Sequence, residues 1–71
     1  MYTIYIVDSE DIAHPKDTSF FTVKNIAIDS IRTNTLKELV GELITILNDQ
    51  TLSDMNWYFL CDEEEGIILH Y

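Results

Sequence analysis

The sequence predicts a small α+β domain in which one helix packs on a four-stranded antiparallel sheet. Three observations predict this fold class. One run of apolar residues has helical spacing, four short runs are rich in β-branched and aromatic residues, and a length of 71 residues suits only one domain. The expected order is strand, strand, helix, strand, strand (ββαββ). The most economical packing of these elements is one helix that covers one face of an antiparallel sheet. Residues 1–71 are expected to form a single domain.

The first half of the chain is expected to supply two strands joined by a polar loop. Residues 2–7 are rich in β-branched and aromatic side chains and stop at an acid, which is typical of a strand. Residues 8–17 contain four acids and a proline, so we expect a loop. Residues 19–28 are interpreted as the second strand, with a bulge near Lys24 because the apolar alternation slips there.

Residues 35–49 predict the helix. Its apolar residues recur at three- and four-residue spacing and form one stripe: Leu36, Leu39, Val40, Leu43, Ile46 and Leu47. Thr35 and Glu38 have the spacing of a capping box, in which the threonine hydroxyl accepts from the amide three residues on and the carboxylate reaches back to the threonine amide. Asn34 is an alternative cap one residue earlier. Gly41, in the middle of the pattern, indicates close contact with the sheet.

The chain is expected to end in a β-hairpin. Residues 48–56 are mostly polar and are interpreted as a connection to it. Residues 57–61 and 67–71 predict two strands, and residues 62–66 predict the tight acidic turn between them. Gly66 can supply the positive φ that such a turn usually needs.

Apolar residues lie on both faces of the predicted strands, although one helix covers only one face. In the strand at 57–61, for example, Trp57 and Phe59 alternate with Tyr58 and Leu60. A large uncovered apolar face usually marks an interaction surface, and a homodimer through this face or through a free edge strand is its simplest form. The alternative is that the loop at residues 8–17 folds over the second face.

Negative charge is concentrated in the second half of the chain. The net charge is −9, from 13 acidic and 4 basic residues: residues 1–37 contain five acids and four bases (−1), and residues 38–71 contain eight acids and no base (−8). This imbalance indicates a positively charged partner and argues against direct binding to nucleic acid, whose phosphates the acids would repel.

Three clusters of acids are candidates for contact with that partner. The first lies along one side of the predicted helix, the second is the turn at 62–65, and the third is the loop at 8–17, for which a plain solvated loop is the alternative. For the turn, the alternative is a solvated hairpin tip that opposes edge-to-edge aggregation. The turn does not have the ligand spacing of a calcium-binding loop. The candidate partner-binding residues are the acids of the first two clusters with one apolar anchor: Glu38, Glu42, Asp49, Asp62, Glu63, Glu64, Glu65 and Tyr58.

The sequence predicts no catalytic, metal or cofactor site. A single cysteine, Cys61, excludes an internal disulfide, and with two histidines it cannot build a zinc framework. Cys61 lies in an apolar strand beside four acids, which should raise its pKa rather than activate it as a nucleophile with His14 or His70. We therefore expect a protein without enzymatic activity. No segment predicts a secretory signal or a membrane span, so a cytoplasmic location is expected.

These observations favour an inhibitor or regulator that occupies a basic nucleic-acid-binding surface of a partner protein. In size, acidity and helix-on-sheet design the chain is similar to phage-encoded anti-restriction and anti-CRISPR proteins that act as DNA mimics, although it shares no motif with them. The alternative is a homo-oligomeric accessory or adaptor module that binds through an apolar sheet face and uses its acids for solubility.

Overall fold

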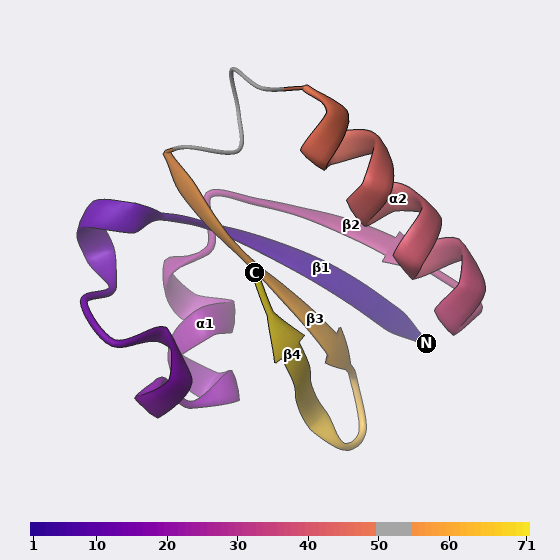
Figure 1. Cartoon of the computed structure of the whole chain (residues 1–71). Coiled ribbons are helices and arrows are strands. Elements are labelled where there is room, and N and C mark those ends of the chain that lie inside the picture. Colours follow the sequence, from indigo (N-terminus) through magenta and orange to yellow (C-terminus); the bar gives the residue numbers. More distant parts are fainter. Residues whose placement is uncertain (50–54) are drawn as a thin grey trace.

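The computed structural model describes residues 1–49 and 55–71, which form one four-stranded antiparallel sheet with an α-helix on each face (Figure 1). The strands are β1 (Tyr2–Asp8), β2 (Asp29–Thr33), β3 (Asn56–Asp62) and β4 (Gly66–His70). The α-helices are α1 (Phe20–Ile26) and α2 (Leu36–Asn48), and two short 3-10 helices, η1 (Ser9–Asp11) and η2 (Pro15–Asp17), lie between β1 and α1. The predicted fold class is confirmed. The connection expected at residues 48–56 falls mainly on 50–54, outside the described residues.

The strand order is β2-β1-β3-β4, so β2 and β4 are the two edges of the sheet. At one end of the sheet, Tyr2 of β1 pairs with Thr33 of β2 and with Asp62 of β3. We call this the turn end, because the β3–β4 turn follows Asp62 directly. The opposite end, where β1 leads into residues 9–17, is called the loop end.

Residues 19–28, expected to be the second strand, instead form α1. Ser19 caps this helix, because its side-chain oxygen accepts a hydrogen bond of 3.1 Å from the amide three residues on. Phe20, Val23 and Ile26 recur every three residues and pack against the sheet. The slip in alternation that suggested a bulge is therefore helical spacing. The second strand is β2, in a stretch to which the sequence pattern assigned no element.

Helix α2 forms where the sequence predicts it. Its cap is Thr35, whose hydroxyl accepts a hydrogen bond of 3.1 Å from the amide of Glu38, and Leu39 and Ile46 are its buried residues. The expectation for Gly41 is wrong, since this residue is exposed and a Cβ there would meet no atom within 4 Å. Neither α-helix of the described residues is long and apolar enough to cross a membrane.

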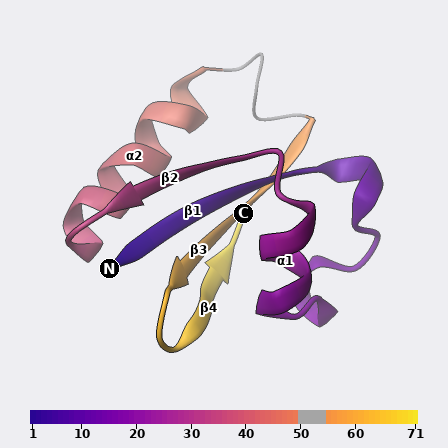
Figure 2. The ribbon, with the colours of Figure 1, turned by 180° about the vertical axis from the view of Figure 1, so that it is seen from behind.

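Two small cores lie on opposite faces of the sheet. The buried residues on the α2 face are Ile4, Leu39, Ile46, Tyr58 and Leu60. On the α1 face they are Val7, Ile12, Val23, Phe59 and Cys61. Figure 1 shows α2 in front and α1 fainter behind, and Figure 2 shows the reverse from the other side. The second face is thus covered by the chain itself, mainly by α1, while the loop at residues 8–17, expected as the alternative cover, contributes the buried Ile12.

The β3–β4 hairpin has the expected turn and one irregularity. Gly66 adopts a φ of 98°, a conformation that a residue with a Cβ rarely takes. Along β4, Leu69 pairs with Leu60 and Ile67 pairs with Cys61, so Ile68 is an extra residue and forms a bulge.

Candidate protein-interaction surface

Helix α2 carries three of the candidate acids at exposed positions. Glu38, Glu42 and Asp49 follow one another at steps of four and seven residues, which places them on one side of the helix, and we call them the acidic row. At about 1.5 Å per residue, Glu42 lies roughly 6 Å and Asp49 roughly 16 Å from Glu38 along the axis. The row therefore extends along most of the helix.

The charges of Glu42 and Asp49 are unfavourable for the helix itself, whereas Glu38 lies in the first turn, where the helix dipole favours an acid. Glu38 and Glu42 are like charges four residues apart, which repel each other. Asp49 is the C-terminal cap, where the last turn holds no basic residue and a negative charge is disfavoured by the helix dipole. Glu38 also has a local role: its carboxylate accepts a hydrogen bond of 3.0 Å from the hydroxyl of Thr35. In this capping box the carboxylate of Glu38 therefore accepts a hydrogen bond from the hydroxyl of Thr35 and not, as expected, from the amide of Thr35.

The acids of the β3–β4 turn are not equivalent. Glu64 and Glu65 are exposed, whereas Asp62 and Glu63 are half-buried. The carboxylate of Asp62 accepts a hydrogen bond of 2.9 Å from the amide of Glu64, which stabilises the turn locally. A partner can therefore reach Glu64 and Glu65 most readily.

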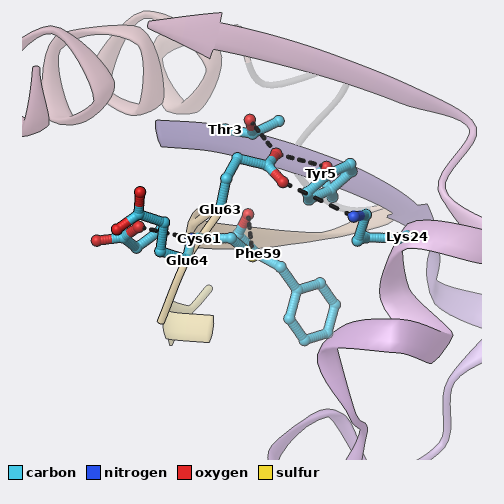
Figure 3. Close-up of polar contacts among 8 residues, drawn as sticks. Thr3, Tyr5, Lys24, Phe59, Cys61, Glu63 and Glu64 are labelled. Atoms are coloured by element: carbon cyan, nitrogen blue, oxygen red, sulfur yellow. Dashed lines mark hydrogen bonds and ion pairs between the residues drawn. The ribbon is translucent and has the colours of Figure 1, made fainter. Parts of the chain in front are cut away.

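Glu63 is bound within the molecule (Figure 3). Its Oε1 accepts hydrogen bonds of 2.7 Å from the hydroxyls of Thr3 and Tyr5, and its Oε2 lies 3.8 Å from Nζ of Lys24. Its amide donates a bond of 3.1 Å to the carbonyl of Met1. The carboxylate therefore joins the turn to β1 and α1, a structural role that the sequence pattern did not indicate.

These contacts shift the ionisation of two groups. The hydrogen bonds from Thr3 and Tyr5 stabilise the charged form of Glu63 and lower its pKa. The pKa of Tyr5 is raised to about 12, first because its hydroxyl is desolvated and second because its proton is bonded to Glu63. At neutral pH the pair is therefore a neutral phenol that donates to a carboxylate.

Tyr58 is a core residue. Its exposed fraction is 1%, and it packs with Ile4 and Leu39 beneath α2. The sequence pattern could not show which face of β3 the helix would cover, and the helix covers the face of Tyr58. This side chain is consequently not available as an apolar anchor.

The candidate acids do not form one continuous surface. Helix α2 starts soon after β2 ends at Thr33, so Glu38 lies at the turn end of the sheet, the same end as Glu64 and Glu65. Asp49 is at the opposite end of α2, and Figure 1 shows the two ends of this helix far apart. The structure thus brings Glu38 and the turn acids to one end and places Asp49 elsewhere.

Few of the acids are neutralised inside the molecule. Between residues of the described ranges one ion pair forms, that of Lys24 with Glu63. Exposed acids that form no ion pair with a described residue occur at both ends of the sheet: Glu10, Asp11, Asp17, Asp29, Glu38, Glu42, Glu64 and Glu65. Their charge is left for solvent ions or for a partner.

Two groups of apolar residues are exposed that sequence reasoning did not single out as surface, although Leu36 and Val40 were counted in the apolar stripe of the helix. Leu36, Val40 and Ile44 recur every four residues on α2, and Leu69 and Tyr71 lie on or beside the edge strand β4. The apolar sector of the helix is wider than packing on the sheet needs, and this width in the sequence indicates that some of its apolar side chains are exposed. For β4, the sequence indication was a strand that contains no charged residue in a chain with 13 acids.

The chemistry of Cys61 follows its environment. The thiol is fully buried, and burial first and the charge of Glu63 second raise its pKa to about 12. The predicted direction of this shift is confirmed, although burial outweighs the acids as its cause. In the part of the chain that the structure describes, no three His, Cys, Asp or Glu side chains form a group that could hold a metal ion.

No protein-family model matches this chain, and the searches of curated proteins and of solved structures also gave no match.

Proposed function

We propose that this protein is a small acidic inhibitor or regulator that occupies a basic nucleic-acid-binding surface of a partner protein. The observation that carries the proposal is the set of exposed acids without an internal counter-charge, described above. Such a surface attracts a cationic groove and speeds association with it. The proposal places the protein in the cytoplasm with its partner and involves no direct contact with nucleic acid.

The acidic row of α2 is the best candidate for the imitation of a nucleic-acid strand. The separation of Glu38 and Glu42 along the helix axis, roughly 6 Å, is comparable with the spacing of phosphates along one strand. The exposed turn acids Glu64 and Glu65, at the same end of the sheet as Glu38, supply further charge there. Lys or Arg side chains of the partner can bind carboxylates on such a rigid helix as they would bind phosphates.

The helix retains this charge at a local cost. The like-charge pair of Glu38 and Glu42, four residues apart, costs about 0.2–0.5 kcal/mol. A basic partner surface offsets this cost. The similarity in size, acidity and helix-on-sheet design to anti-restriction and anti-CRISPR proteins, which bind proteins that act on nucleic acid, agrees with this picture.

Two variants with the same net charge test the proposal. The first, Glu38→Gln with Glu42→Gln, neutralises two of the three acids of the acidic row and keeps a side chain that supports the helix cap. The matched control, Glu10→Gln with Asp17→Asn, removes two exposed charges from the loop end. Each protein is immobilised, exposed to an extract of the native host, and eluted first with duplex DNA and then with salt.

We expect the wild type and the control to retain a nucleic-acid-binding protein that DNA displaces, and the first variant to lose it. The captured protein is then purified, and its binding to DNA or RNA must weaken when the wild-type chain is added. An equal loss of capture in both variants would show that net charge alone is responsible, and full capture by the first variant would contradict the proposal. Tight binding of this chain to DNA in a mobility-shift assay would also contradict the proposal.

A further inference from the structure

The two edges of the sheet are protected differently. The outer edge strand β2 carries the exposed charged residues Asp29 and Arg32, which oppose pairing with another strand. The other edge, β4, has the sequence Gly-Ile-Ile-Leu-His and carries no Asp, Glu, Lys or Arg. In a chain with 13 acids, the edge most open to pairing is thus the one without charge.

The backbone of β4 has groups that are directed away from the sheet. Tyr71 and Tyr58 exchange both of their hydrogen bonds, at 2.9 and 3.0 Å, so both backbone groups of Tyr71 are directed toward β3. Because hydrogen-bonded and non-hydrogen-bonded pairs alternate in an antiparallel ladder, the N–H and C=O of the preceding residue, His70, are directed outward. These groups can bind a further strand.

The side chains beside this edge are apolar and half-exposed. Leu69 pairs with Leu60, and Tyr71 with Tyr58, so both extend the α2 face of the sheet. Their exposed fractions are 46% and 59%. Whatever pairs with β4 can therefore bury apolar surface as well as backbone.

The absence of charged residues from β4 indicates which kind of partner can pair with this strand. A cationic protein gains nothing from a neutral strand and is expected on the acidic surfaces instead. A second copy of this chain brings the same neutral apolar strand, and two-fold antiparallel pairing places the two acidic turns at opposite ends of the paired strands. A five-residue strand spans about 17 Å, roughly twice the distance of about 8 Å over which physiological salt screens charge.

We propose that β4 pairs antiparallel with β4 of a second copy, so that two sheets join into one. A single short edge with a few half-exposed side chains is smaller than the about 1,200 Å² that stable complexes bury. The dimer is therefore weak and depends on protein concentration. It goes beyond the proposed function and does not rest on it.

Salt distinguishes the two proposals. Each copy carries a net charge of −9, so the two copies repel each other and screening by salt strengthens the dimer. Binding of a basic partner to the acidic surface weakens with salt instead. Loss of one kind of binding therefore says nothing against the other.

The test is sedimentation equilibrium of the whole chain from micromolar to millimolar concentration, at low and at high salt. We expect a monomer–dimer equilibrium that shifts toward the dimer as salt rises. Leu69→Lys should weaken dimerisation at least about tenfold, because it places two like charges near the paired strands. The matched control is Ile44→Lys, which makes the same change of charge at a residue of α2 that is 54% exposed, and should leave the dimer intact.

Hydrogen exchange gives a second readout. The amide of His70 should exchange quickly in the monomer and slow down as the protein concentration rises, while outward amides of β2 stay fast. A monomer at all concentrations and salts overturns the proposal. So does a dimer that Leu69→Lys leaves intact, one that Ile44→Lys disrupts equally, or one that salt dissociates.

Discussion

The hydroxyl of Tyr5 donates a hydrogen bond of 2.7 Å to Oε1 of Glu63, a residue 58 positions further along the chain. The bond joins β1, one of the two central strands of the sheet, to the turn that follows β3. Its acceptor is a carboxylate that Thr3 and Lys24 also contact, so one acid connects three elements of a very small domain. A turn that looks like a solvated acidic tip is thereby fixed to the rest of the fold.

Tyr5→Phe should therefore destabilise the protein. The change keeps the ring and its edge contact with Phe20 but removes the donor to Glu63. A hydrogen bond to a charged group contributes about 1.5–3 kcal/mol, and solvent around the half-buried pair reduces this, so we expect a loss of about 1 kcal/mol. Urea unfolding measures it. Tyr2→Phe is the control, since the hydroxyl of Tyr2 has no hydrogen-bond partner among the described residues; equal losses in both variants would contradict the role of the Tyr5 bond.

The pH dependence of stability should report on Glu63. Its pKa is lower in the folded protein than the ordinary value of 4.5, so its contribution is present above pH 4.5 and is lost as the pH falls through the folded pKa. Glu63→Gln removes this contribution. The difference in unfolding free energy between wild type and variant should be constant near neutral pH and shrink below about pH 4. A difference that stays constant down to about pH 2 would mean that Glu63 does not titrate as the contacts require.

The helical register of α1 can be tested by two positions that are two residues apart. In a strand, Phe21 and Val23 would share one face and respond alike to substitution. In α1, Phe21 is 74% exposed and Val23 is fully buried. Phe21→Ser should change the unfolding free energy by less than about 0.5 kcal/mol, whereas Val23→Ser should cost about 2 kcal/mol or more. Thermal unfolding followed by circular dichroism separates these outcomes.

This region also shows where sequence patterns were insufficient. Helix α2 was predictable because its apolar residues keep helical spacing over more than three turns and Thr35 supplies a cap. Helix α1 has only seven residues, which is too short for its spacing to be told from an irregular strand. Its helical state depends on the Ser19 cap and on packing of Val23 against the sheet, and tertiary packing cannot be read from local pattern.

The acidic surface was predictable in part. The exposure of Glu42, Glu64 and Glu65 follows from helix periodicity and from the position of the turn. The internal role of Glu63 does not, since it requires β1 to lie beside β3 in a register that brings Tyr5 and Thr3 close to the turn. The burial of Tyr58 likewise depended on which face of the sheet α2 covers.

The two glycines should respond oppositely to alanine. Gly41 lies in α2 with open space around its Cα, so Gly41→Ala should stabilise the protein by about 0.5–1 kcal/mol through helix propensity. Gly66 has a φ of 98°, and Gly66→Ala should destabilise it by about 1 kcal/mol because of backbone strain. Urea unfolding of both variants checks the pair. A loss of stability in Gly41→Ala would contradict the open surroundings of this residue in α2.

Glu42→Lys should stabilise the isolated protein while it weakens binding to a basic partner. The new lysine lies four residues after Glu38, so a like-charge pair becomes a favourable pair with the acid nearer the N-terminus, and self-repulsion falls. The expected gain is about 0.5 kcal/mol at low salt, and salt should diminish it. Calorimetry measures the stability, and retention of the captured host protein measures the binding. Unchanged or stronger binding would mean that the partner does not use the charge of Glu42, whereas a gain in stability with a loss of binding identifies an acid retained for its partner.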